Sequence, residues 1–249
     1  MTNLKIFDHY SLRARLQPAL LVLLPAAIGV FAWTGPGVQW QSALWTLFGT
    51  AGGTYFLAIL ARNFGSKIEM GLWQSWGGAP TTQLLRHSGP ANPVMRERWH
   101  NYLSKLLGKS FPAPQEEAAN PGRADDIYNA AVKLQISKTR DTKKYHLLFK
   151  ENMHYGFCRN LFAMRFSGIV VAVLGVAASC AASFWFVHIG DPKIAPWVCT
   201  AANMMLLLLW IFIVKSDWVK IPAFAYAERL FESTEQPART KKEKDEKKA

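Results

Sequence analysis

The side chains that could bind a ligand are basic and aromatic, and they lie in the middle of the chain. The candidate ligand-binding residues are Arg86, Arg96, Arg98, Trp99, Arg140, Lys143 and Lys144, accompanied by Trp73 and Trp76. Guanidinium and ammonium groups pair with phosphates, and tryptophan rings stack on planar groups or cations. The set therefore predicts a pocket for an anionic nucleotide. The same side chains suit lipid-facing anchors and solvated helix faces equally well.

Signals for catalysis and metal binding are weaker. None of the six histidines has another histidine four residues away, the spacing of a helical metal site. Gly77 and Gly78 lack the Lys-Ser/Thr pair of a phosphate loop, and the chain has no Gly-x-Ser-x-Gly motif. The three cysteines show neither paired nor metal-type spacing, which predicts free thiols. We expect no catalytic residue, no metal ion and no cofactor, and therefore not an enzyme.

The elements that must position these residues are set by four apolar blocks. The blocks are Leu16 to Trp33, Trp40 to Ala61, Phe166 to Val187 and Ala195 to Val214. A helix of about 20 residues crosses a hydrocarbon core of about 30 Å. The sequence thus predicts an all-α integral membrane protein with four transmembrane helices in two hairpins. A cytosolic helical segment would lie between the hairpins.

The predicted domain organisation follows from these blocks and from the charges between them. It comprises a cytosolic N-terminus (1–15), transmembrane hairpin 1 (16–61), the cytosolic helical segment (62–165), transmembrane hairpin 2 (166–214), a cytosolic juxtamembrane segment (215–238) and a disordered charged tail (239–249). No small-residue cleavage site follows the first apolar block, so we expect no cleavable signal peptide.

Helix packing in the membrane is predicted by small side chains at helical spacing. The candidate packing residues are Gly49, Gly53, Gly168, Ala172, Gly175, Ser179 and Asn203. Small residues on one face let two helices approach closely, and an amide in hydrocarbon needs a hydrogen-bonding partner. We expect Asn203 to face Ser179 or Thr50. None of the four predicted spans carries an acidic or basic side chain, which disfavours a proton- or ion-coupled transporter.

The net charge of +12 is explained by cations that flank the spans. Basic residues concentrate on the cytoplasmic side of membrane proteins and attract anionic headgroups, so we expect no nucleic-acid partner. With four spans, this rule places both termini in the cytoplasm.

Turn and cap residues divide the middle segment into short helices. Residues 68–76 form an amphipathic stretch that ends in a turn at 77–80, after which Thr81 or Thr82 is expected to cap a short helix. Helices are predicted over 96–107, with Gly108 as its C-terminal cap, over 124–139 and over 145–162. Residues 111–122, which contain three prolines, are expected to be a connector.

Three strings carry a family resemblance: YSLRARLQPALLVLLP at 10–25, LWQSWGGAPTTQLLRH at 72–87 and TRDTKKYHLLFKENMHYGFCRNLF at 139–162. They resemble uncharacterised bacterial inner-membrane proteins with a cytosolic segment between two hairpins. The resemblance implies a location in the bacterial inner membrane and carries over no catalytic residue. In architecture the chain is also similar to membrane components of bacterial antiviral defence systems.

These observations lead to one main hypothesis and two alternatives. The main one is a non-enzymatic multi-pass membrane module, in which the cytosolic segment receives a partner or signal and the hairpins anchor an assembly or perturb the membrane. Its expected partners are the lipid bilayer, a second copy or membrane-protein complex, and a cytosolic protein. The alternatives are transport of a small solute or lipid, and membrane-tethered nucleotide binding.

Overall fold

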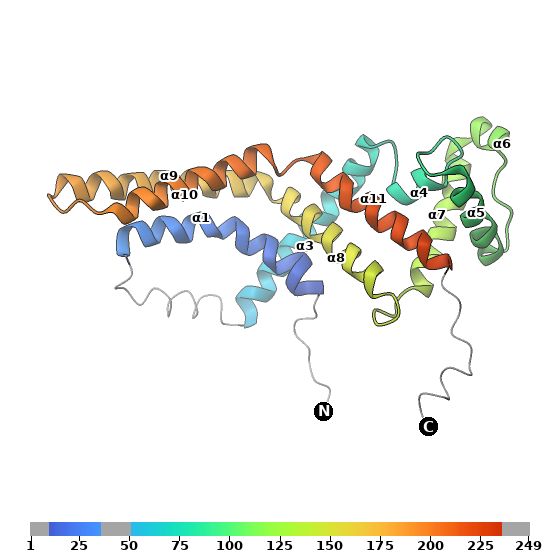
Figure 1. The fold of residues 1–249 in the computed structure, drawn as a ribbon, viewed down its shortest axis with the longest axis horizontal. Helices are drawn as coiled ribbons and strands as arrows, with labels where there is room; N and C mark the ends of the chain where they lie inside the picture. Colours follow the sequence, from blue (N-terminus) through green and yellow to red (C-terminus); the bar gives the residue numbers. More distant parts are fainter. Residues whose placement is uncertain (1–9, 36–50, 236–249) are drawn as a thin grey trace, which may run out of the picture. The chain divides into compact units, whose positions relative to one another are not determined.

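The computed structural model describes residues 10–35 and 51–235, and within these ranges the chain is helical with no strand (Figure 1). The π-helix η1 (Ser11–Leu16) leads directly into α1 (Gln17–Thr34). The remaining helices are α3 (Ala51–Ser75), α4 (Pro80–Leu85), α5 (Pro93–Leu107), α6 (Pro114–Ala119), α7 (Pro121–Lys138), α8 (His146–Ala163), α9 (Arg165–His188), α10 (Ile194–Phe212), α11 (Ser216–Glu232) and the 3₁₀-helix η2 (Ser233–Glu235).

These helices belong to two compact units. The first unit consists of Met1–Leu72 and Met153–Pro222, and the second consists of Trp73–Asn152 and Ala223–Ala249. The division falls within α3, α8 and α11, so each of these helices contributes to both units.

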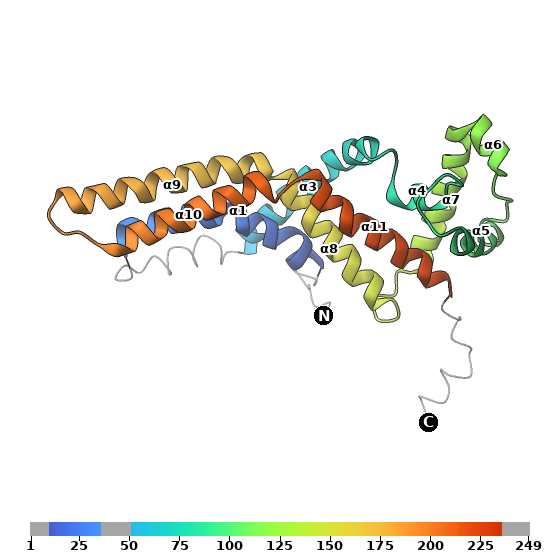
Figure 2. The ribbon, with the colours of Figure 1, turned by 45° about the horizontal axis from the view of Figure 1, so that its top comes forward.

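The first unit is built on α1, α9 and α10, which pack along one another (Figures 1 and 2). Three stretches of the described residues are long and apolar enough to cross a membrane: Ser11–Thr34, Arg165–His188 and Ile194–Phe212. The expectation of four such helices is therefore corrected to three for the described residues. Half of the second predicted block, 40–50, lies outside them, and the other half, 51–61, forms the start of α3, which continues past Arg62.

The close packing of α1, α9 and α10 depends on small side chains on α9. Gly168, Ala172, Gly175 and Ser179 are all buried. A Cβ atom at Gly175 would lie 2.6 Å from the carbonyl oxygen of Pro25 on α1. The face of α9 that carries the predicted packing residues is thus covered by α1 and α10 of the same chain.

The second unit has its own hydrophobic core, formed by α4, α5, α7 and the parts of α8 and α11 that belong to it. Its fully buried side chains include Leu85, Leu103, Tyr128 and Phe231. A core that holds aromatic and aliphatic side chains from five helices indicates a globular domain rather than a set of separate surface helices.

Cap residues explain where the helices of this unit begin and end. Asn92 accepts backbone N–H groups at the start of α5, Gly108 ends that helix at φ +68°, and Asn120 caps α7. Neither Thr81 nor Thr82 is a cap: α4 starts at Pro80 after Ala79. Residues 111–122 are not simply a connector, because they contain α6 and the first two residues of α7. Proline fits the first turn of a helix, where its missing N–H is not needed.

Candidate functional site

The predicted ligand-binding residues have different surroundings in the second unit. Arg86 pairs with Asp125, and the exposed Arg98 lies 3.2 Å from Glu235. Trp99 is in the hydrophobic core, with its ring centroid 5.0 Å from that of Phe231. Arg96 donates to the Gly89 carbonyl at 3.4 Å, and Arg140 and Lys143 are exposed. Arg86 and Lys144 line separate depressions, so these two residues do not share a pocket.

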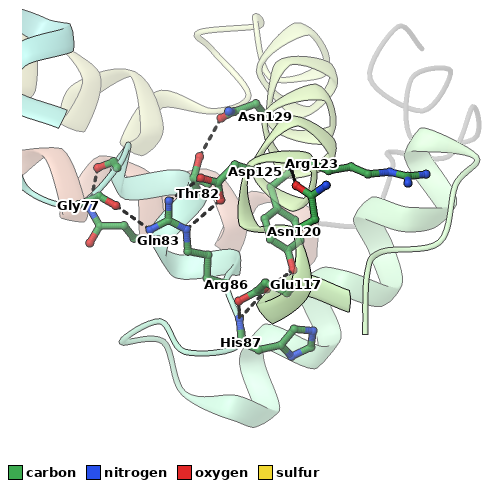
Figure 3. Close-up of polar contacts among 12 residues, drawn as sticks. Gly77, Thr82, Gln83, Arg86, His87, Glu117, Asn120, Arg123, Asp125 and Asn129 are labelled. Atoms are coloured by element: carbon green, nitrogen blue, oxygen red, sulfur yellow. Dashed lines mark hydrogen bonds and ion pairs between the residues drawn. The ribbon is translucent and has the colours of Figure 1, made fainter. Parts of the chain in front are cut away.

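The strongest polar network in the unit joins the segment 77–89 to α6 and α7, and Figure 3 shows its members. Arg86 lies at its centre. Its Nε and Nη2 atoms donate to the two carboxylate oxygens of Asp125 at 2.9 and 2.5 Å, and its Nη1 donates to the Gly77 carbonyl at 2.6 Å. This pairing raises the pKa of the guanidinium. A bidentate pair fixes both distance and orientation, so Arg86 holds the Gly77–Gly78 turn against α7.

Two further side chains hold the same segment. Gln83 donates to the Gly78 carbonyl at 2.6 Å, and the Thr82 hydroxyl donates to Asn129 of α7 at 2.8 Å (Figure 3). Gly78 has a φ of +131°, which favours glycine, and a Cβ there would lie 2.9 Å from Nη2 of Arg86. The glycine is therefore required both by the turn and by the arginine that packs on it.

The buried carboxylate of Glu117 is the second centre of the network. It accepts the backbone N–H of His87 at 3.0 and 3.1 Å and the hydroxyl of Tyr128 at 2.6 Å, and only 8% of the residue is exposed. Burial, together with the hydrogen bond to Glu117, raises the pKa of Tyr128. Tyr128 therefore stays protonated and acts as a donor. Glu117 joins α6 to the end of α4 and to α7.

Two histidines complete this region. His87 bonds through Nε2 to the Pro112 carbonyl at 3.0 Å, and His100 bonds through Nε2 to the Leu85 carbonyl at 2.7 Å. Because a carbonyl only accepts, both rings carry hydrogen on Nε2. The ring centroids lie 5.1 Å apart, edge to face. Burial lowers the pKa of His100, so this ring is neutral near pH 7.

A depression of about 500 Å³ lies beside this network and is lined by Arg86, His87, Ser88, Pro114, Glu117, Ala118, Pro121 and Asp125. The charged members are already hydrogen-bonded to one another or to the backbone, which leaves the Ser88 hydroxyl and Nδ1 of His87 as the groups best placed to meet a ligand. No cluster of metal-ligating side chains occurs among the described residues. The hydrogen bonds of Arg86 and Glu117 fix the position of the 77–89 segment against α6 and α7.

The first unit contains a second group of polar contacts, which involves residues of η1, α3 and α8. Arg159 donates to Glu69 at 2.6 Å, and Tyr155 donates to the same carboxylate at 2.8 Å. Asn160 donates to the Ala14 carbonyl at 2.6 Å. These bonds join α8 to α3 and η1, and the nearby charge of Glu69 raises the pKa of Arg159 despite its burial.

Inside the apolar bundle, Asn203 is fully buried and donates to Ser179 at 3.4 Å. Of its two expected partners, Ser179 is therefore in contact; Thr50 lies outside the described residues, as does Gly49. The Oδ1 atom of Asn203 has no hydrogen-bond partner. Ser183 and Thr200 continue the polar line between α9 and α10 at 3.4 Å.

Sequence reasoning missed Glu117, Tyr128 and the pairing role of Asp125. Asp125 lies near the start of the predicted helix 124–139, and Glu117 lies in the predicted connector 111–122. The sequence shows two acidic residues between prolines, Glu116 and Glu117, and nothing in that pattern indicates which of them pairs with Tyr128 on the next helix. No family model, curated protein or solved structure matches the chain.

Proposed function

We propose that this chain is a non-enzymatic multi-pass protein of the bacterial inner membrane. Its apolar helices anchor it, and its second unit receives a partner or signal on the cytoplasmic side. The hairpins either anchor an assembly or perturb the bilayer when that signal arrives.

The observation that carries the proposal is the inverted polarity of α9. Its small and weakly polar residues face inward, whereas large apolar side chains face outward, including Phe166 at 80%, Leu174 at 62% and Phe184 at 61% exposure. Exposed apolar surface costs about 25 cal/mol per Å² in water. A bilayer removes this cost along the length of the helix.

Aromatic residues at the loop end of the bundle support the same proposal. Trp33 and Trp185 lie with ring centroids 6.4 Å apart, and Phe184 and Trp197 lie 5.5 Å apart. Tryptophan rings favour the level of the lipid headgroups, where one edge is apolar and the other hydrated. The loop between α9 and α10 would then emerge on the outer face.

A receiving role for the second unit is supported by its polar network. The guanidinium of Arg86 donates to Asp125, and the carboxylate of Glu117 accepts the His87 N–H and the Tyr128 hydroxyl. These charged groups therefore shape a surface in which no acid–base pair is left free. A fixed surface of this kind suits recognition of a protein partner.

Membrane extraction and site-directed labelling of the full chain test this proposal. In bacterial membranes the protein should resist alkaline carbonate. An impermeant maleimide applied to whole cells should label Asp191→Cys, in the α9–α10 loop, and leave Ser88→Cys unlabelled until the cells are opened. Release by carbonate, or labelling of Ser88→Cys in intact cells, would overturn the proposal.

The bilayer-perturbing version is tested with a membrane-potential dye. Cells that express the full chain should depolarise under phage infection if the hairpins act in antiviral defence. No depolarisation under any trigger would leave only the anchoring role.

One observation favours transport as a second candidate function: the buried Oδ1 atom of Asn203, which lacks a donor in the middle of the bundle. A transported polar solute could supply that donor. Asn203→Leu should then abolish flux of the solute across reconstituted vesicles, and unchanged flux would count against transport.

A further inference from the structure

Four exposed cations lie at one level of the first unit, and they are called here the cation collar. They are Arg13 on η1, Arg62 and Lys67 on α3, and Lys215 between α10 and α11. Residues 160–164, at the end of α8 and just before α9 begins, define this level along the bundle, because all four cations lie near them. Each collar residue is one or two positions from a residue that contacts this stretch.

Two collar residues are placed by hydrogen bonding and close contact with Asn160. The side-chain amide of Asn160 donates to the carbonyl of Ala14, which follows Arg13. Gly65, two residues before Lys67, lies so close to the Asn160 side chain that a Cβ atom would not fit between them.

The other two are placed by the hydrophobic core of the unit. Ala61 and Val214 pack in one cluster with Leu161 and Met164. Arg62 follows Ala61, and Lys215 follows Val214. The collar therefore marks one end of the apolar bundle on three separate segments of the chain.

The four collar cations are exposed and have no acidic partner among the described residues; Lys215 lies over the Phe212 ring, 5.9 Å from its centroid. Arg165, at the same level, donates to the Trp210 and Ile211 carbonyls at the end of α10 and is thereby used within the chain. At the opposite end, Lys193 pairs with Asp191 at 3.1 Å. Among the described residues of this unit, exposed cations without an acidic partner thus gather at one end of the bundle.

We infer that the cation collar binds the headgroups of anionic phospholipids in the cytoplasmic leaflet. This inference rests on the proposed membrane-spanning function. Exposed ammonium and guanidinium groups at the end of a span reach the headgroup phosphates, and each cation near an anionic surface strengthens binding by about five-fold. The collar would both orient the chain and keep anionic lipid around the base of the bundle.

Tryptophan quenching in reconstituted vesicles tests the inference. The full chain is reconstituted into phosphatidylcholine vesicles that contain brominated phosphatidylglycerol, and quenching gives the binding of the anionic lipid relative to phosphatidylcholine. We expect a preference of several-fold for phosphatidylglycerol at low salt. It should fall to near one in the quadruple variant R13Q/R62Q/K67Q/K215Q and weaken at high salt in the wild type.

Lys193→Gln is the matched control, because it removes a cation from the opposite end, and it should keep the wild-type preference. Equal preference in the wild type and the quadruple variant, with both inserted in the vesicles, would overturn the inference while leaving the membrane-spanning function intact. Failure of the wild type to insert would instead overturn the proposed function. If the quadruple variant does not insert, the salt dependence of the wild type decides: a preference unchanged by salt refutes the collar.

Discussion

Replacing Glu117 by alanine should loosen the second unit, because the side chain of this residue links α6 to the end of α4 and to α7. Its carboxylate accepts the His87 N–H and the Tyr128 hydroxyl, and both donors lose their partner in Glu117→Ala. The alanine side chain leaves the backbone of α6 otherwise unchanged. The effect should therefore concentrate in α6, in the start of α7 and at the end of α4.

The magnitude follows from the two lost donors. A hydrogen bond to a charged group contributes about 1.5 to 3 kcal/mol, and part of this gain is offset by the cost of burying the carboxylate. We expect Glu117→Ala to lower the free energy of unfolding of the second unit by about 3 kcal/mol. Glu117→Gln keeps one acceptor and should cost about half as much.

Hydrogen exchange of the full chain in detergent micelles provides the assay, because it resolves α6 and the His87 amide from the membrane helices. Glu116→Ala is a matched control: the neighbouring Glu116 is exposed and accepts only the Ala113 N–H, at 2.9 Å. It should change the free energy of unfolding by no more than about 0.5 kcal/mol.

Equal protection of α6 and His87 in the Glu117→Ala and Glu116→Ala variants would refute the reasoning. So would a loss spread uniformly over α3 and α10. In either case the buried carboxylate would not be what fastens α6 to its neighbours.

Three other perturbations test separate parts of the structure. Gly175→Val should lower the thermal midpoint of the extracted protein because its Cβ would meet the Pro25 carbonyl, whereas Gly71→Ala, which has open space, should raise the stability of α3 by about 0.5 to 1 kcal/mol. A midpoint unchanged by Gly175→Val contradicts this packing. Burial lowers the pKa of His100, so the folded second unit excludes a proton that the unfolded chain binds below about pH 6.5. Its free energy of unfolding should fall as the pH drops through that value, by at most about 1.4 kcal/mol per pH unit, and denaturant titrations of His100→Gln should lack this slope. Glu69→Gln should destabilise the first unit by about 3 kcal/mol in detergent denaturation, since it leaves the largely buried Arg159 charge without its partner; a change below about 1 kcal/mol would show that the pair is not needed.

The apolar helices were predictable because their signal is local. The blocks 16–33, 166–187 and 195–214 correspond to α1, α9 and α10 within a few residues. Length and composition suffice to define a helix of this kind, since each backbone group bonds within its own segment. Helices α5, α7 and α8 were likewise predicted from cap residues and apolar periodicity, although α7 begins three residues earlier than expected, at Pro121.

Other features could not be obtained from local pattern. The sequence offered Arg86 as a ligand-binding cation, yet it is paired with Asp125, thirty-nine residues away. Nothing in the proline-rich stretch 111–122 distinguishes Glu117 from Glu116, but one is buried and the other exposed. Pairings over such separations depend on how α4, α6 and α7 pack, and a single sequence does not record that packing.

By itself, the sequence determined that the described chain is helical, where three of the stretches apolar enough to cross a membrane lie, and where small side chains recur on α9. These properties depend on neighbours three or four residues apart. Only the tertiary structure decided that Gly175 faces Pro25, that Asn203 meets Ser179, and which cations of the described residues lack an acidic partner. The physical reason is that burial and charge pairing depend on distances in space, and folding brings together side chains that the sequence keeps far apart.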